Sequence, residues 1–184
     1  MLNAEQEVWA SADLHYGHKK VIAFCTRPYV GLEAMVEDIT AKWNSVVKPN
    51  DIAYILGDVA WTTASLQAIN RLNGKLHLIL GNHDCEKRMR KFDRWESVQH
   101  YARIKYGDKR FILSHCPFEV WPGQEKGSIH LHGHTHNNRS HIATKKTRRF
   151  DVGVDCHNMY PVSLASIIER VKREEMQVSL FNYM

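Results

Sequence analysis

Five short apolar segments in this sequence each end in polar residues, and this repeated pattern limits the folds that the chain can adopt. Runs of this length and composition are typical of β-strands. In sheets that alternate with helices, ligands bind beyond the carboxyl ends of the strands. One site can therefore collect the polar residues that follow the five segments, which are Asp13 with His15, Asp58, Asn82 with His83, His115, and His134 with His136.

Two of these groups contain residues spaced two apart, which is a spacing that suits metal ligands. His134 and His136 follow residues 129–132, and Asp13 and His15 follow the first apolar segment. In an extended backbone, side chains two residues apart point to the same side. Each pair can therefore supply two ligands to one metal ion.

The chemical types of these candidate ligands constrain the metal. Imidazole, carboxylate and amide groups without a thiolate favour Mn, Fe, Zn or Ni over Cu(I) or Ca²⁺. The candidates are too numerous for one tetrahedral zinc ion. We therefore expect two divalent ions bridged by one carboxylate. The ions of such a centre are typically about 3.5–4 Å apart, and they stabilise the attacking and the leaving oxygen when a phosphoryl group is displaced.

Hydrophobic periodicity predicts a mixed α/β chain. Expected strands cover residues 7–12, 52–56, 76–80, 102–106, 110–113, 129–132 and 176–181. Expected helices cover residues 32–47, 64–72, 86–95 and 164–171.

Length and composition indicate one globular domain spanning residues 1–184. No apolar run approaches the roughly 20 residues of a membrane-spanning helix, so we expect no membrane contact. The acidic first residues lack a signal-peptide core, and the four cysteines form no CxxC pair, which favours a cytoplasmic location with reduced thiols. The formal net charge of +5 favours anionic partners.

The motifs, taken together, resemble the signature of the calcineurin-like metallophosphoesterases. They occur in that family's order and span residues 13–136, and residues 13–18 are similar to a variant of a small bacterial and phage branch. The resemblance implies a four-layer α/β/β/α sandwich with a dinuclear site at the carboxyl ends of the strands. The matching motifs are Asp13-x-His15, Gly57-Asp58, Gly81-Asn82-His83-Asp84, Ser114-His115 and Gly133-His134-Thr135-His136.

The same resemblance implies a role for each matching residue. One metal is expected on Asp13, His15, Asp58 and His136, and the other on Asp58, Asn82, His115 and His134. His83 is expected to contact the phosphate and act as general acid, with Asp84 orienting it through a hydrogen bond.

The expected reaction is hydrolysis of phosphodiesters, phosphomonoesters or both, by a hydroxide that bridges two metal ions. Mn is the first choice of metal, with Fe, Zn and Ni left open. The expected substrate is a small phosphate ester, with a nucleotide among the candidates, and the chain is expected to be a monomer or a homodimer.

Two further residues have a functional and an ordinary interpretation. His18 either contacts the substrate phosphate or lies outside the ligand set, and Arg27 either binds phosphate or is a surface arginine beside Pro28. We also expect Asp155 to support the site from outside the ligand set.

Two other functions stay open. A nuclease or cyclic-nucleotide phosphodiesterase would use the same site, but the basic stretch at residues 139–149 lacks the interleaved aromatic residues that stack on bases, which weakens the case for nucleic acid. A non-catalytic metal-binding scaffold on the same fold is the second alternative. The presence of every expected ligand and of His83 favours an enzyme.

Overall fold

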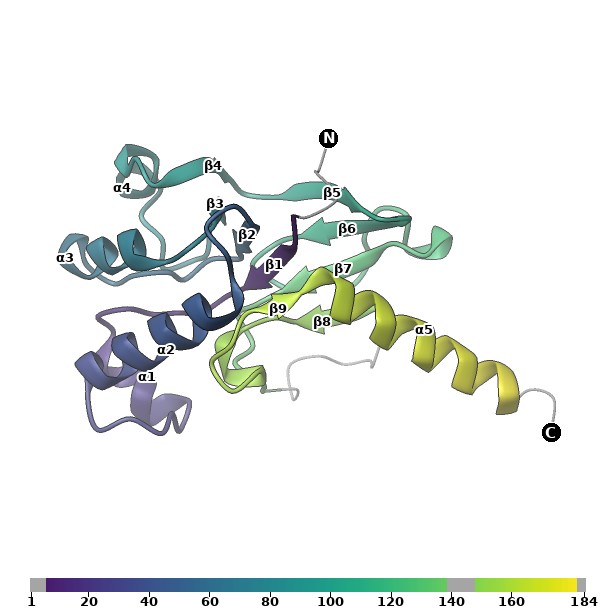
Figure 1. The fold of residues 1–184 in the computed structure, drawn as a ribbon, viewed down its shortest axis with the longest axis horizontal. Coiled ribbons are helices and arrows are strands. Elements are labelled where there is room, and N and C mark those ends of the chain that lie inside the picture. The colour runs from purple at the N-terminus through teal and green to yellow at the C-terminus, as the bar shows by residue number, and fades with distance from the viewer. Residues whose placement is uncertain (1–5, 139–147, 182–184) are drawn as a thin grey trace.

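The strands form two sheets in the computed structural model, which describes residues 6–138 and 148–181 (Figure 1). The five-stranded sheet has the order β4-β3-β2-β1-β9, and the four-stranded sheet has the order β5-β6-β7-β8. The first sheet contains β1 (Val8–Ser11), β2 (Ile52–Ile55), β3 (Lys75–Ile79), β4 (Trp95–Gln99) and β9 (Val162–Ser163). The second contains β5 (Ala102–Tyr106), β6 (Lys109–Leu113), β7 (Ile129–His132) and β8 (Arg149–Asp151).

Helices α1 to α4 gather beside the five-stranded sheet, and the long α5 runs past β8 and β9 (Figure 1). The helices are α1 (Lys19–Phe24), α2 (Leu32–Val46), α3 (Thr63–Leu66), α4 (Glu86–Lys91) and α5 (Leu164–Phe181). Short 3₁₀ turns complete the described secondary structure, namely η1 (Gln67–Arg71), η2 (Gln124–Lys126) and η4 (Val154–Cys156).

Two hydrophobic cores hold these elements together. The first packs α2, α3 and α4 against the five-stranded sheet, with Trp43 and Ile39 fully buried. The second joins the two sheets and the start of α5, through residues such as Leu131 and Leu164. The mixed α/β prediction with two sheets is confirmed, whereas the count of four layers stays a prediction.

Parallel pairing brings the carboxyl ends of the expected strands to one edge. In the first sheet β1 pairs with β2, and β2 with β3, in parallel. In the second sheet β6 pairs with β7, and β7 with β8, in parallel. The segments that follow β1, β2, β3, β6 and β7 are those that carry the candidate ligands.

Three predicted elements differ from the structure. The strand predicted at residues 176–181 is wrong, because α5 continues to Phe181 and no glycine or proline interrupts the helix after Leu164. The helix predicted at residues 86–95 ends at Lys91, and Trp95 begins β4, where its aromatic side chain suits a strand. The helix predicted at residues 64–72 is divided between α3 and η1.

No helix within residues 6–138 and 148–181 is long and apolar enough to cross a membrane. Most of the predicted basic stretch, residues 139–147, lies outside the described residues.

Candidate metal centre

Backbone hydrogen bonds join the segments that follow the strands. The N–H of Asp13 donates to the Gly57 carbonyl at 3.0 Å, and that of His15 donates to the Asp58 carbonyl at 2.9 Å. The two sheets meet where the His134 N–H donates to Oδ2 of Asp13 at 2.9 Å. These bonds bring candidate ligands from β1, β2 and β7 to the same place.

Most of the expected ligands lie in left-handed backbone conformation. This conformation disfavours residues that have a Cβ atom and costs about 1 kcal/mol or more for each one. The surrounding structure must therefore impose it, which is common where side chains are aimed at a functional site. The residues concerned, with φ between 47° and 71°, are Asp13, His15, Asp58, His134 and His136.

Two glycines let the backbone approach the candidate carboxylates closely. A Cβ atom on Gly133 would lie 2.6 Å from Oδ2 of Asp13, and one on Gly81 would lie 2.5 Å from the backbone nitrogen of Asp58. Real Cβ atoms do not reach such distances. Glycine is therefore required at both positions if Asp13 and Asp58 are to keep these orientations.

The first group of candidate ligands consists of Asp13, His15 and His136, whose ligand atoms all lie within 4.8 Å of one another. Oδ1 of Asp13 and Nε2 of His15 are buried and have no hydrogen-bond partner. Buried polar atoms without partners are rare, and a binding site for an ion is one of their ordinary explanations. This pair therefore fits a cation.

The second group consists of Asn82, His115 and His134. Oδ1 of Asn82 lies 2.8 Å from Nε2 of His115 and 3.0 Å from Nδ1 of His134. The two imidazole nitrogens are 3.2 Å apart. Nδ1 of His115 donates to the Leu56 carbonyl at 2.7 Å, which leaves Nε2 as the nitrogen able to bind a metal.

Asp58 lies between the two groups. Its Oδ2 is 3.6 Å from Nε2 of His15 and 3.4 Å from Nε2 of His115. Its Oδ1 accepts the N–H of His83 at 2.9 Å. One carboxylate thus faces a ligand of each group.

Burial and neighbouring charges shift the pKa values of the groups in this centre. Burial raises the pKa of Asp13 to about 7 and lowers that of His15 to about 3. Burial opposes a charged His115, but the hydrogen bond and negative charge of Asp58 outweigh it and raise the pKa of His115 to about 9. A divalent cation would supply positive charge beside the buried carboxylates of this centre.

The residues present fit divalent metal ions. The two groups offer imidazole nitrogens, carboxylate oxygens and one amide oxygen, a set that suits Mn, Fe, Zn or Ni. The unpartnered atoms of Asp13 and His15 are available without breaking a hydrogen bond. The structure thus brings together all seven candidate ligands that the sequence indicates.

Asp155 and Arg27 fix the position of His136. Nδ1 of His136 donates to Oδ2 of Asp155 at 2.7 Å, so its Nε2 faces Asp13 at 4.0 Å. Arg27 donates to both oxygens of Asp155, at 2.7 and 2.8 Å, and to the Asp13 carbonyl at 2.7 Å. The prediction of a supporting role for Asp155 agrees with these contacts.

The interpretation of Arg27 as a surface residue is wrong, because its side chain is 0% exposed. The alternative of a phosphate contact also loses support, because the guanidinium already donates hydrogen bonds to Asp155 and to backbone carbonyls. Arg27 braces the first group of ligands.

Asp84 differs from its prediction. Its carboxylate accepts backbone N–H groups of Asp58 and Gly81, both at 2.9 Å, and of Val59 at 3.1 Å. No hydrogen bond joins it to the His83 imidazole among the described residues. Asp84 therefore positions the Asp58 segment, because short loops with several free N–H groups attract a carboxylate.

His83 and His18 lie at the rim, beside an aromatic residue that the sequence analysis did not single out. The His18 ring stacks on Trp61 with centroids 4.1 Å apart, and the His83 ring is 5.3 Å from Trp61. Trp61 is 45% exposed, which is unusual for an indole in a small protein. Its position three residues after Asp58 was the only sequence signal for a place near the site.

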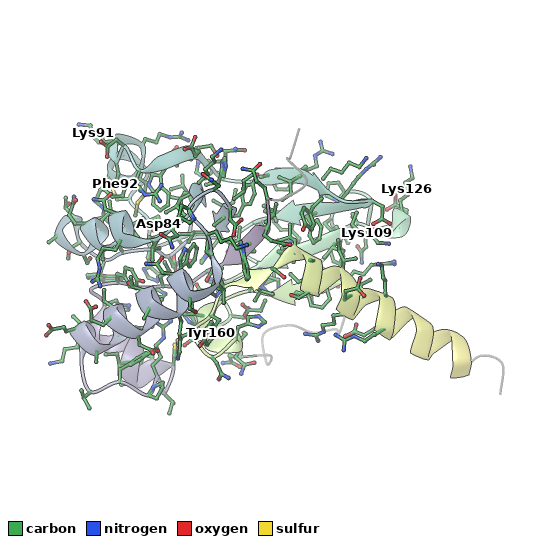
Figure 2. All side chains as sticks on the ribbon, viewed as in Figure 1. Asp84, Lys91, Phe92, Lys109, Lys126 and Tyr160 are labelled. Atoms are coloured by element: carbon green, nitrogen blue, oxygen red, sulfur yellow. The ribbon has the colours of Figure 1, made fainter. Side chains whose placement is uncertain are left out.

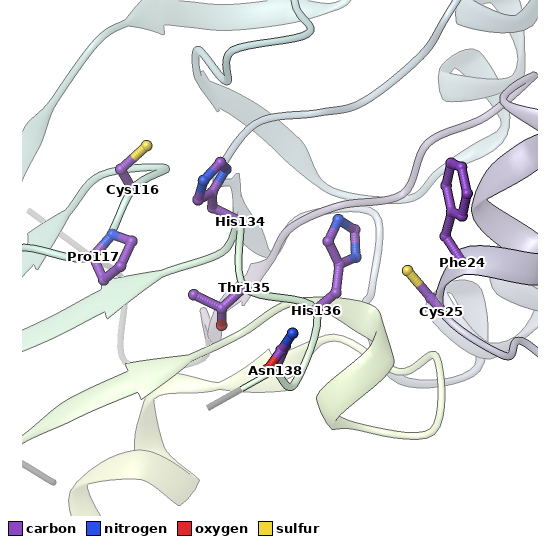
Figure 3. A pocket seen from close by; sticks show the side chains of 8 residues that line it. All are labelled: Phe24, Cys25, Cys116, Pro117, His134, Thr135, His136 and Asn138. Carbon is purple, nitrogen blue, oxygen red and sulfur yellow. The ribbon is translucent and has the colours of Figure 1, made fainter. Parts of the chain in front are cut away.

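A pocket of about 600 Å³ opens beside the candidate ligands (Figure 3). His134 and His136 form part of its wall, while Cys25 and Cys116 carry their thiols on opposite sides of these two imidazoles (Figure 3). Phe24 and Pro117 make the wall partly apolar. Two of the candidate ligands are therefore accessible from this side.

Comparison with known proteins supports the assignment. Residues 7–151 match the family described as calcineurin-like phosphoesterase. The chain is similar to an uncharacterized protein of Methanocaldococcus jannaschii, with 29% identity over 91% of this chain and 93% of that protein. It is also similar to the gene 66 protein of Mycobacterium phage D29, with 31% identity over 84% of this chain and 92% of that protein.

A solved structure gives the same result for the fold. A protein of unknown function from Aquifex aeolicus superposes with a TM-score of 0.73 at 27% identity, covering 90% of this chain and 99% of that one. The family match and the clustered ligands support a metal-dependent phosphoesterase. The chain belongs to the calcineurin-like phosphoesterase family.

Proposed function

We propose that this chain hydrolyses phosphate esters with two divalent metal ions, Mn²⁺ foremost, held on either side of Asp58. The observation that supports this most strongly is the place of Asp58 Oδ2, which lies 3.6 Å from His15 and 3.4 Å from His115. When bound, the two ions generate a nucleophile from water near neutral pH and offset negative charge on the phosphoryl oxygens.

The side chains around Asp58 orient the ligands. Asp13, His15 and His136 would hold one ion, Asn82, His115 and His134 would hold the other, and Asp58 would serve both. The bonds from His115 to Leu56 and from His136 to Asp155 fix which imidazole nitrogen faces the centre. Rigid ligands of this kind reduce the rearrangement needed during the reaction.

His83 donates a proton to the leaving oxygen. Two observations support this role: the His83 backbone N–H donates to Oδ1 of Asp58 at 2.9 Å, and its imidazole lies at the exposed rim, with its centroid 5.7 Å from that of the His15 ring. Asp84 is a positioning residue, because its carboxylate accepts the backbone N–H groups of Asp58 and Val59 and so holds the Asp58 segment in place. The His18 ring lies 4.1 Å from that of Trp61 and 5.3 Å from that of His15 between centroids, and this closeness to a candidate ligand supports a contact of His18 with the substrate.

The direct test uses metal-stripped protein with Mn²⁺ restored. Turnover of p-nitrophenyl phosphate and of bis(p-nitrophenyl) phosphate is measured for the wild type, for Asp58→Asn, and for Asp108→Asn as a control at an exposed carboxylate. We expect Mn²⁺-dependent turnover that falls at least about 100-fold in Asp58→Asn and is unchanged in the control. Metal binding without turnover on either ester, with Mn²⁺, Fe²⁺, Zn²⁺ or Ni²⁺, would contradict the proposal and favour a scaffold.

A further inference from the structure

A second pocket, of about 560 Å³, lies between α3 and α4, apart from the one beside the imidazoles. Its lining includes two large apolar side chains, Leu66 and Phe92, and three cationic residues, Lys87, Arg88 and Lys91. Figure 2 shows Lys91, the last residue of α4, and Phe92, which follows it, at the end of the molecule away from Lys126. No described residue that lines this pocket is acidic.

The positive charges of this pocket are not neutralised by carboxylates. Among the described residues no ion pair involves Lys87, Arg88 or Lys91. On the same helix Arg90 pairs with Glu86 at 2.7 Å, so helix α4 leaves only its pocket-lining cations unpaired. Arg88 donates to the carbonyls of Ala60 and Trp61, and its buried Nε has no acceptor.

This pocket adjoins the two segments that carry the reaction. Its lining residue Cys85 lies two positions after His83. Arg88 holds the carbonyls of Ala60 at 2.9 Å and of Trp61 at 3.4 Å, just after Asp58 in sequence. The Trp61 ring in turn lies 5.3 Å from that of His83. A ligand in the pocket can therefore belong to a molecule whose ester lies at the metal centre.

We propose that this pocket binds a second phosphate group of the substrate, and the proposal rests on the phosphoesterase function above. Three unpaired cations favour an anion of more than one charge. Arg and Lys are the side chains that recognise phosphate oxygens, and the apolar lining residues suit the carbon skeleton that joins the two phosphates. The substrate class is thus a small organic molecule with one esterified phosphate and another phosphate nearby.

The test compares two substrates that differ in one phosphate. Thymidine 5′-(p-nitrophenyl phosphate) carries only the scissile group, and its 3′-phosphorylated form carries the second phosphate as well. The variants are Lys87→Gln/Lys91→Gln and, as a control of equal charge, Lys105→Gln/Lys126→Gln, whose lysines are exposed on other elements. All proteins are assayed with Mn²⁺ restored.

For the 3′-phosphorylated substrate we expect the Lys87→Gln/Lys91→Gln variant to raise KM about tenfold with kcat unchanged, because two exposed charge contacts together contribute about this factor. KM for the substrate without the 3′-phosphate, and both constants of the control variant, should not change. Equal effects on both substrates, or no effect on either, would overturn the proposal. A p-nitrophenyl ester of a trinucleotide tests whether the natural substrate is instead the end of a nucleic acid. If its KM is lower than that of the 3′-phosphorylated thymidine substrate, the assignment of a small-molecule substrate would be overturned.

The experiments can distinguish a wrong assignment of the pocket from a wrong assignment of the reaction. If the wild type hydrolyses neither substrate, the proposed function fails, and the pocket is then tested by calorimetric titration with thymidine 3′,5′-bisphosphate. Binding to the wild type and to Lys105→Gln/Lys126→Gln, but not to Lys87→Gln/Lys91→Gln, supports the pocket. Equal binding by all three proteins would overturn it.

Discussion

Single residues carry most of the information about this site, because each candidate ligand is held by a specific neighbour. His136 is fixed by Asp155, His115 by the Leu56 carbonyl, and Asp13 by the His134 N–H. The identity of the ligands could be predicted from sequence, since ligand type and spacing recur at the strand ends. The neighbours could be predicted only in part, because they come from distant segments.

Arg27 and Asp84 illustrate this limit. The sequence predicts a phosphate contact or a surface position for Arg27, yet its guanidinium is buried on Asp155, which is 128 positions away. Asp84 was expected beside the His83 ring, and it instead binds the backbone of Asp58 and Val59. Local spacing does not reveal which of several nearby hydrogen-bond donors a carboxylate selects.

Replacing His83 tests its role as general acid. We expect His83→Ala to lower kcat by about 10²- to 10⁴-fold on an alkyl ester, because such leaving groups need protonation, and much less on a p-nitrophenyl ester. Steady-state kinetics on both esters give the comparison, and His100→Ala serves as a control at an exposed imidazole. Full activity of His83→Ala on the alkyl ester would show that the proton comes from elsewhere.

Replacing Asp155 tests the support of His136. The Asn side chain of Asp155→Asn cannot supply the negative charge that stabilises the His136 Nδ1–H, and we expect Mn²⁺ affinity to fall about 10- to 100-fold. Calorimetric titration of the metal-stripped protein measures the affinity. Unchanged affinity, with only a lower midpoint of thermal unfolding, would limit Asp155 to a role in stability.

At the scale of elements, the parallel strands determine where the site lies. Short apolar runs bounded by glycine and polar residues made β1, β2, β3 and β7 predictable, because buried strands show this pattern. Strand β4 was missed because it follows a charged helix without a clear break. The end of α5 was misassigned because alternating apolar residues near the end of a chain resemble a strand when they are considered without the helix before them.

The left-handed residues at the strand ends were also beyond sequence analysis. Nothing in the residue types of Asp13, His15 or His134 requires positive φ. Their backbone N–H groups donate to distant segments, those of Asp13 and His15 to the segment after β2 and that of His134 to the Asp13 carboxylate. The sequence does reveal the nearby glycines, Gly81 and Gly133, which let the backbone approach the candidate carboxylates closely.

Adding one carbon atom at Gly81 tests the close approach of two loops. A Cβ atom there would collide with the Asp58 backbone, so we expect Gly81→Ala to lower the free energy of unfolding by about 1–3 kcal/mol and to weaken metal binding. Denaturant unfolding measures the first effect. Gly31→Ala is the control without a collision, since no atom lies within 4 Å of its added Cβ. It should leave metal binding unchanged, and the lower preference for Ala at the N-cap of α2 should lower the free energy of unfolding by only about 0.5–1 kcal/mol. Equal losses in the two variants would contradict this account of Gly81.

At the scale of the whole molecule, the site depends on both sheets at once. The five-stranded sheet supplies Asp13, His15, Asp58 and Asn82, and the four-stranded sheet supplies His115, His134 and His136. Asp58 is the residue at which the two sets meet. The central claim is therefore that one carboxylate couples ligands from the two halves of the molecule.

Low-temperature electron paramagnetic resonance of the Mn²⁺-loaded protein, with its metal content measured in parallel, tests this claim most directly. A carboxylate shared by two Mn²⁺ ions about 3.5–4 Å apart predicts two ions per chain and a spin-coupled multiline signal. In Asp58→Asn that coupled signal should be lost. A wild-type protein that binds one Mn²⁺ ion, or two that give only uncoupled signals, would contradict the account.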